Sequence, residues 1–82
     1  MMIRTTAIAE QQLCNLPKSI RARVDDLIDR LKKWPEVSGV KPLRGDLAGH
    51  YRLRTGDFRL QFRVVGQDII IERIGHREGF YD

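Results

Sequence analysis

The stretch that decides the fold is YRLRTGDFRLQFRVV, residues 51–65, in which apolar and polar side chains alternate on both sides of a Thr-Gly-Asp sequence. Alternation with a period of two is typical of strands with one apolar face, and Thr-Gly-Asp is typical of a tight turn. The predicted apolar face carries Tyr51, Leu53, Phe58, Leu60, Phe62 and Val64. We therefore predict two antiparallel strands, residues 51–54 and 58–65, whose two faces differ in character.

A third strand is predicted on the C-terminal side of this hairpin. Gly66-Gln67 has the composition of a second hairpin turn, and residues 68–74 follow it. Because residues 69–71 are three consecutive isoleucines, we expect the centre of this strand to be buried on both faces. Gly75 is expected to break the strand, which completes an antiparallel meander.

Two helices are predicted on the N-terminal side. Residues 7–14 are good helix formers, and a second helix starts with Pro17 in its first turn and ends before Pro35. Its apolar positions fall on one stripe, namely Ile20, Val24, Leu27, Ile28, Leu31 and Trp34. Residues 2–6 are expected to add a strand, and residues 36–49 a loop. The predicted fold is α+β, one domain over residues 1–82 with both helices packed on one face of a small antiparallel sheet.

Composition narrows the class of protein. The chain has 15 Lys and Arg against 11 Asp and Glu, a formal net charge of +4, which favours an anionic partner such as nucleic acid, an acidic protein or a membrane surface. Cys14 is the only cysteine, which excludes an intrachain disulfide and a cysteine zinc site. We find no secretory signal and no apolar run of the ~18 residues that a membrane span needs. A cytoplasmic protein is therefore expected.

The positive charge is concentrated in residues 41–63. The basic residues there are Lys41, Arg44, Arg52, Arg54, Arg59 and Arg63, and six basic minus two acidic residues gives +4, equal to the net charge of the chain. In a meander the last four project from the face opposite the apolar one. Arginine binds phosphate through two parallel hydrogen bonds, so the pattern predicts a polyanion site, with RNA as the expected ligand. The alternative is a solvated face whose arginines pair with Asp57, Asp68 and Glu72.

The C-terminal tail brings other chemistry close to that face. His76, Arg77 and Tyr81 lie within six residues of one another. A histidine can carry protons near neutral pH, an arginine adds a cation, and a tyrosine can stack on a base. The alternative is that these residues are structural or simply exposed.

The residues quoted above, together with Leu43, Gly45 and Ile74-Gly75-His76-Arg77, resemble the RelE/ParE superfamily of bacterial toxins. The family pattern has a leucine-x-glycine, an aromatic-basic-x-basic strand, a glycine-aspartate-aromatic-arginine sequence, and a last strand ending in His-Arg with a tyrosine beyond it. The resemblance covers nearly the whole chain. It implies a β-α-α-β-β-β fold and a toxin of a type II toxin–antitoxin pair, in which RelE-like members cut mRNA without a metal and ParE-like members act on DNA gyrase.

The resemblance also implies a site. In RelE-like enzymes the catalytic positions correspond to Arg52, Arg54, Arg59, Arg77 and Tyr81. The charge pattern, apart from the resemblance, adds Lys41, Arg44 and Arg63 as residues expected to bind RNA. Where a lysine pair can stand in the family, this chain has Arg52 and Arg54. Arginine essentially never loses its proton, so either His76 transfers protons, or catalysis is mostly electrostatic, or activity is weak. No metal or cofactor is expected.

Three functions follow as hypotheses. The first is an mRNA interferase that acts in the A site of the 30S ribosomal subunit, and the second is a gyrase inhibitor without nuclease activity. The third is a basic binding module or an inactive homologue, which would not be toxic. The first two imply a cognate antitoxin in a hetero-oligomer, with an extended or helical antitoxin segment over the basic face and the helices. None of the three implies a membrane partner.

Overall fold

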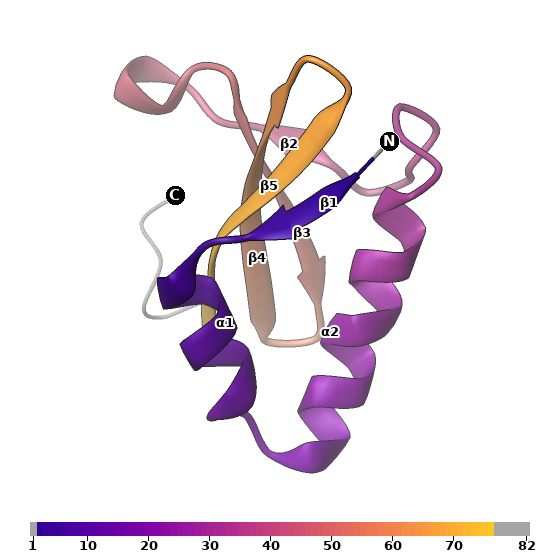
Figure 1. The fold of residues 1–82 in the computed structure, drawn as a ribbon, viewed down its shortest axis with the longest axis vertical. Helices are drawn as coiled ribbons and strands as arrows, with labels where there is room; N and C mark the ends of the chain where they lie inside the picture. The colour runs from indigo at the N-terminus through magenta and orange to yellow at the C-terminus, as the bar shows by residue number, and fades with distance from the viewer. Residues whose placement is uncertain (1, 77–82) are drawn as a thin grey trace.

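Two helices and five strands form an α+β fold in the computed structural model, which describes residues 2–76 (Figure 1). The elements are β1 (Ile3–Thr5), α1 (Ala7–Cys14), α2 (Lys18–Leu31), β2 (Lys41–Pro42), the 3₁₀ turn η1 (Gly45–Leu47), β3 (His50–Thr55), β4 (Phe58–Val65) and β5 (Asp68–His76). They form one sheet in the order β1-β5-β4-β3-β2. Strand β1 pairs in parallel with β5, and the other pairs are antiparallel. The predicted fold class, both helices and the N-terminal strand are confirmed.

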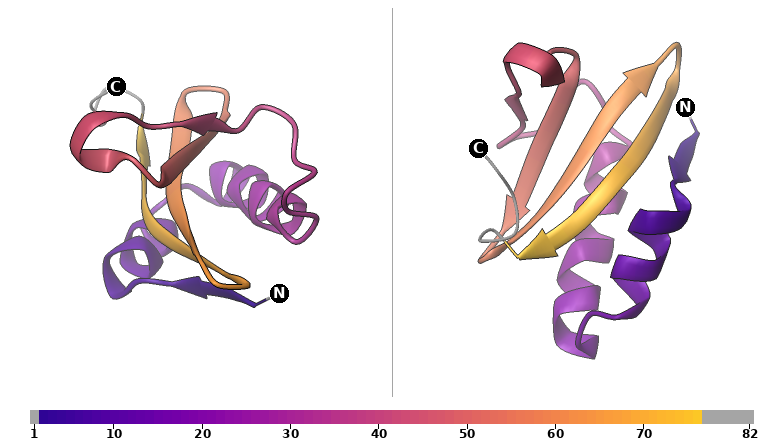
Figure 2. Two further views of the ribbon diagram at one scale, coloured as in Figure 1. Left: turned by 90° about the horizontal axis from the view of Figure 1, so that it is seen from above. Right: turned by 90° about the vertical axis from the view of Figure 1, so that its left-hand side faces the viewer.

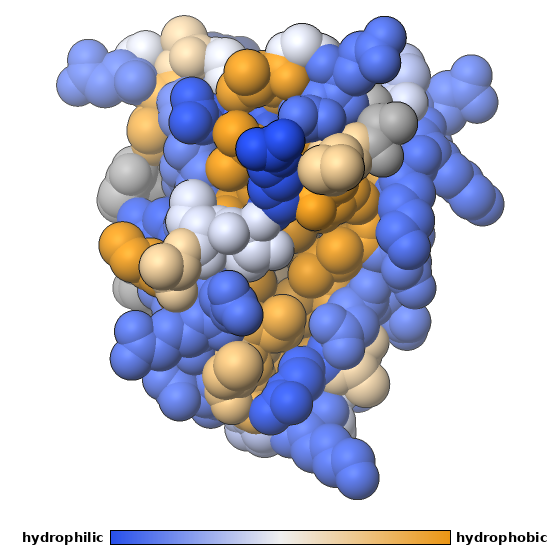
Figure 3. Space-filling view, in the orientation of Figure 1, coloured by the Kyte–Doolittle hydropathy of each residue, from blue (hydrophilic) through white to orange (hydrophobic). Residues whose placement is uncertain are grey.

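Both helices cover the same face of the sheet (Figure 2). Helix α2 buries Val24, Leu27 and Leu31 of the predicted stripe. They pack with Ala9 of α1 and with the apolar face of the sheet, whose buried members are Leu53, Leu60, Phe62, Ile69, Ile71 and Ile74. An apolar band remains visible between the hydrophilic surfaces of the two helices (Figure 3). Neither helix in the described part of the chain is long and apolar enough to cross a membrane.

Helix α2 is shorter than its apolar stripe suggested. It ends at Leu31, and the chain continues in a turn in which the Trp34 amide donates to the Leu31 carbonyl at 3.0 Å. Trp34 still reaches the core, because its ring lies 5.1 Å from the Tyr51 ring and 5.5 Å from the Phe62 ring. The edge-to-face geometry of both pairs is a favourable one for aromatic rings.

A β-bulge interrupts the pairing of the two longest strands. Gln61 faces Arg73 while Phe62 faces Ile71, so Glu72 is an extra residue in β5. The bulge changes which residues face the core, because Ile69 and Ile71 precede it and Ile74 follows it. Ile70 lies on the other face and is only half-buried, so the predicted burial of this strand on both faces is wrong.

Two further expectations are corrected. Gly75 does not end β5, because it pairs with Arg59 and the strand runs on to His76. Within the expected loop, Lys41–Pro42 forms the edge strand β2 and Gly45–Leu47 forms η1. Pro42 fits there because an edge strand has one side on which no N–H is needed. The predicted turns are confirmed, and Gly56 and Gly66 provide their positive φ angles of 57° and 60°.

Phe62 is the residue on which we expect the core to depend most. Its side chain is 0% exposed and its ring lies 5.5 Å from the rings of both Trp34 and Tyr51. Replacing Phe62 with Ala should lower the free energy of unfolding by about 3–5 kcal/mol, because a large cavity opens. Urea unfolding measures this, with Val65→Ala, 48% exposed, as a control expected to change it by less than ~0.5 kcal/mol. A loss below ~1 kcal/mol for Phe62→Ala would contradict this description of the core.

Candidate functional site

The face of the sheet away from the helices carries the predicted cations, and we call it the open face. The β3–β4 register pairs His50 with Arg63, Arg52 with Gln61, and Arg54 with Arg59. Residues paired across strands project to the same side, so the four arginines share one face, as predicted. Strand β2 adds a cation to it, because Lys41 pairs with Arg52.

Arg54 and Arg59 form a like-charged pair at one end of the open face. They are directly opposite each other in the register. Arg54 is exposed, whereas Arg59 is buried at 7% exposure. Charges that directly face each other across strands repel, and a partly desolvated guanidinium attracts an anion more strongly than one in water. An anion bound between them would turn the repulsion into two favourable contacts.

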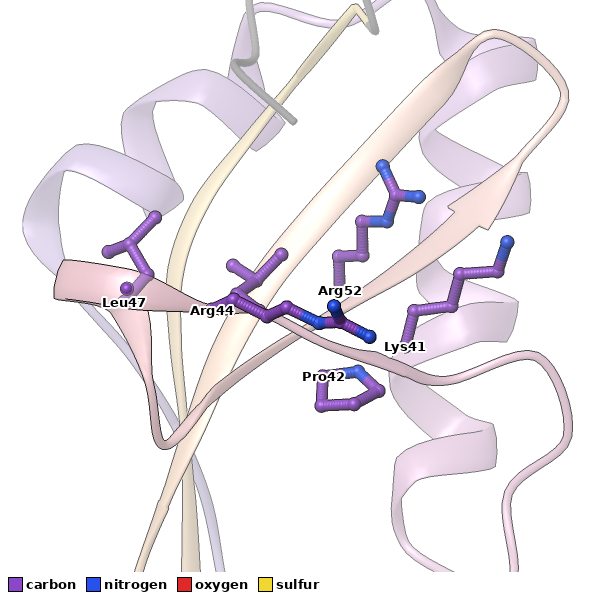
Figure 4. Close-up of a pocket in the computed structure, with 7 residues that line it drawn as sticks. Lys41, Pro42, Arg44, Leu47 and Arg52 are labelled. Carbon is purple, nitrogen blue, oxygen red and sulfur yellow. The ribbon is translucent and has the colours of Figure 1, made fainter.

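A hollow along β2 and β3 is lined by both cationic and apolar side chains (Figure 4). The cavity has a volume of about 530 Å³ and is lined by Lys41, Pro42, Leu43, Arg44, Gly45, Leu47 and Arg52. A smaller cavity of about 230 Å³, lined by Gly39, Lys41, Arg52 and Arg54, shares two of these residues. The larger volume lies in the range of small-ligand sites. The two cavities therefore bring four of the predicted cations together along β2 and β3.

Glu72 projects on this open face, and its carboxylate contacts three neighbouring side chains. His50 Nδ1 lies 2.5 Å and Gln61 Nε2 3.2 Å from its Oε1. Arg63 Nε lies 3.6 Å from its Oε2. The ion pair with Arg63 confirms one of the pairs that we considered as an alternative to RNA binding. Arg63 is thus partly neutralised.

His76 is separated from these arginines by the sheet. It pairs with Phe58 at the end of β5, and the two rings lie 5.3 Å apart at 80°. Phe58 belongs to the apolar side of β4, so His76 projects on that side too. Arg77 and Tyr81 lie outside the described residues. Within residues 2–76 no three His, Cys, Asp or Glu side chains are grouped to hold a metal ion.

Sequence reasoning missed two features of this face. If β5 were a regular strand, alternation from Ile69 and Ile71 would place Arg73 on the apolar side. The bulge at Glu72 instead pairs Arg73 with Gln61, on the open face. The sequence does contain a signal, because the next core isoleucine is residue 74 rather than 73. His50 was given no role, although its hydrogen bond to Glu72 makes it part of the open face.

The amino-acid sequence of this chain is similar to those of known proteins. A family model described as "ParE toxin of type II toxin-antitoxin system, parDE" matches residues 3–81. "Toxin RelG" of Mycobacterium tuberculosis is 35% identical over 82 residues, covering 96% of this chain and 93% of the relative. "Putative toxin RelE1" of Methanocaldococcus jannaschii is 40% identical over 76 residues, covering 87% and 83%.

Solved structures agree with these relatives. The toxin–antitoxin complex RelBE2 of Mycobacterium tuberculosis contains a chain that superposes with a TM-score of 0.80 at 34% identity, covering 93% of this chain and 96% of that one. The isolated RelE toxin of E. coli superposes with a TM-score of 0.78 over 92% of this chain and 82% of its own. At 15% identity that second match shows a shared fold.

The electrostatic description of the open face predicts a salt-dependent effect on stability. Replacing Arg54 with Gln removes the charge opposite Arg59, so the free energy of unfolding should rise by about 0.5 kcal/mol at low salt. The gain should shrink in ~1 M salt, where screening is strong. Urea unfolding at both salt concentrations measures it, and Lys33→Gln, which removes the same charge next to α2, is the matched control. Equal effects of the two variants would contradict the repulsion.

Proposed function

The chain belongs to the RelE/ParE superfamily of type II toxin–antitoxin toxins, and from this premise we propose that it is an mRNA interferase, a metal-independent endoribonuclease. The observation that carries the proposal is the cationic hollow on the open face. Lys41 and Arg52 line both the hollow and the smaller cavity beside it, Arg54 lines the smaller cavity, and the buried Arg59 is paired with Arg54. Such a surface offers several guanidinium groups to one RNA backbone.

The reaction is attack by the ribose 2′-oxygen on the adjacent phosphate, which leaves a 2′,3′-cyclic phosphate and a free 5′-hydroxyl. Negative charge builds up on the phosphorus oxygens in the transition state, so fixed cations there stabilise it more than the substrate. Arg59 is suited to this role because its strand and its burial hold it in place. Arg52 and Arg54 extend the positive field from the neighbouring strand.

RNA on either side of the cleaved bond would be held by the larger cavity. Lys41 and Arg44 offer cations to flanking phosphates, and Pro42, Leu43 and Leu47 give an apolar floor for a base. Binding of this kind weakens with salt, because each phosphate contact releases a counterion. Arg63 contributes less, since Glu72 already pairs with it.

Three residues near the C-terminus enter the proposal from the sequence, Arg77 and Tyr81 through the resemblance and His76 through its ability to carry protons. Arg77 would add a second cation at the phosphate, Tyr81 would stack on a base and hold the nucleotide in line for attack, and His76 would transfer a proton. His76 packs on Phe58 on the apolar side of the sheet. Because His76 lies on the other side of the sheet from the arginines, activation of the 2′-hydroxyl falls to a group on the open face.

A cognate antitoxin is the partner we propose, because the RelE-like structures of M. tuberculosis and M. jannaschii were solved as complexes with antitoxins. An acidic segment would neutralise the open face, and an apolar one would cover the band between the helices (Figure 3). The result would be a toxin–antitoxin hetero-oligomer. We place the target mRNA in the A site of the 30S subunit, and the protein in the cytoplasm.

A second candidate is inhibition of DNA gyrase, the function that the resemblance implies for ParE-like members of the superfamily. Fold alone does not separate the two functions, because one fold can carry different sites. The gyrase function predicts that Tyr81 and His76 are dispensable for toxicity. The interferase function predicts that Tyr81 and the arginines are required.

The test is induction of the chain in a bacterial host without its antitoxin, with primer extension on a defined transcript. We expect growth arrest and new, codon-phased 5′ ends. Both should be lost in the double variant Arg59→Ala, Arg77→Ala, because the cations at the phosphate are gone, and kept in Lys33→Ala at equal protein level. Growth arrest with intact mRNA and persistent gyrase–DNA breaks would establish the gyrase function instead, and unchanged growth would point to a binding module.

A further inference from the structure

We propose that His50 and Glu72 act as a pair in RNA cleavage, with His50 as the general base for the ribose 2′-hydroxyl and Glu72 as its positioning residue. The inference rests on the proposed endoribonuclease function and supplies the proton acceptor that the arginines cannot provide. An arginine side chain stays protonated in proteins, whereas a neutral imidazole carries one nitrogen with a lone pair.

The hydrogen bond between the two side chains fixes which nitrogen is available. His50 Nδ1 lies 2.5 Å from Glu72 Oε1. A carboxylate only accepts, so Nδ1 carries the hydrogen, and in the neutral ring Nε2 is left as the acceptor. A base held by a third group in this way is a common arrangement in enzymes that activate a hydroxyl.

Glu72 is itself held in place from several directions. Gln61 Nε2 donates to its Oε1 at 3.2 Å, and Arg63 Nε lies 3.6 Å from its Oε2. The Thr6 hydroxyl donates to the Glu72 backbone carbonyl at 2.9 Å. The bulge makes Glu72 the extra residue of β5. These contacts direct a β5 carboxylate across β4 to a histidine on β3.

The pair lies next to Arg52, one of the cations that the proposed function places around the phosphate. His50 is two residues before Arg52 on the same face of β3, about 7 Å along the strand. Arg52 lines both cavities. The side chains of His50 and Glu72 are 24% and 22% exposed, so the imidazole is accessible without being fully solvated.

The proton balance of the step is complete with water as the only other reactant. Nε2 takes the proton of the 2′-hydroxyl as the 2′-oxygen–phosphorus bond forms. The bond from phosphorus to the 5′-oxygen breaks, and that oxygen takes a proton from water. The imidazolium is stabilised by the Glu72 carboxylate and then returns its proton to the hydroxide, so the pair ends in its starting state.

Three substitutions separate this role from a structural one. His50→Asn keeps an N–H close to the position of Nδ1 for the hydrogen bond to Glu72 but has no Nε2. Glu72→Gln keeps an acceptor oxygen but removes the charge that stabilises the imidazolium. Asp68→Asn is the matched control, because it also removes a β5 carboxylate, one whose ion pair is with Arg4 at 3.6 Å.

The experiment is single-turnover cleavage of a defined mRNA on programmed ribosomes, with affinity and melting temperature measured for each variant. We expect His50→Asn to slow cleavage by about 100-fold or more at unchanged affinity and melting temperature. Glu72→Gln should slow it by a smaller factor, and Asp68→Asn should leave it unchanged. Free imidazole should restore cleavage by His50→Ala, which a structural role would not allow.

The outcomes separate this inference from the proposed function. Cleavage by the wild type together with a wild-type rate for His50→Asn would overturn the pair alone. A slow His50→Asn whose melting temperature also falls, with no imidazole rescue of His50→Ala, would also overturn it in favour of a structural contact. Absence of cleavage by the wild type itself would remove the proposed function and the pair with it.

Discussion

The extra residue in β5 is the constraint on which both faces of the sheet depend. The bulge at Glu72 lets Ile69, Ile71 and Ile74 all face the helices although their spacing does not fit a regular strand. The Ile74 amide beyond the bulge donates to Gln12 Oε1 of α1 at 2.7 Å, which ties the helix to the irregular strand. On the other face the same bulge presents Glu72 and Arg73, so the core and the candidate site are set by one local feature.

Like-charged side chains lie opposite each other on the open face, and their repulsion lowers the stability of the fold. A sheet with only a structural role would avoid such pairs. Lys41 and Arg52 are paired across strands, as are Arg54 and Arg59, and both are like-charged pairs. Among the described residues of this face, Glu72 opposes the charge by holding Arg63 and His50. Natural proteins tolerate such conflicts mainly at functional sites, where a bound partner relieves them. In a chain of 82 residues the stability margin is small, so an anionic partner should also stabilise the fold.

The elements were predictable from sequence because their signals are local. The stripe of α2 and the alternation in residues 51–65 identified the helix, the hairpin and the shared arginine face. The bulge, β2 and the partnership of His50 with Glu72 were not predicted, because each depends on register across strands rather than on spacing within one. Lys41–Pro42 is a strand only through its pairing with β3, and a proline-containing segment between glycines has the composition of a loop. The positions of Arg77 and Tyr81 stay predictions.

The central claim is that the open face of the sheet, rather than the helical face, holds RNA. The most direct measurement is a titration of the ¹⁵N-labelled chain with a short single-stranded RNA, followed by amide chemical shifts. We expect the shifts to cluster in β2, β3 and β4, around Lys41, Arg52 and Arg59, while the amides on the exposed side of α2 stay unchanged. Shifts confined to α1 and α2, with the amides of the three strands unmoved, would contradict it.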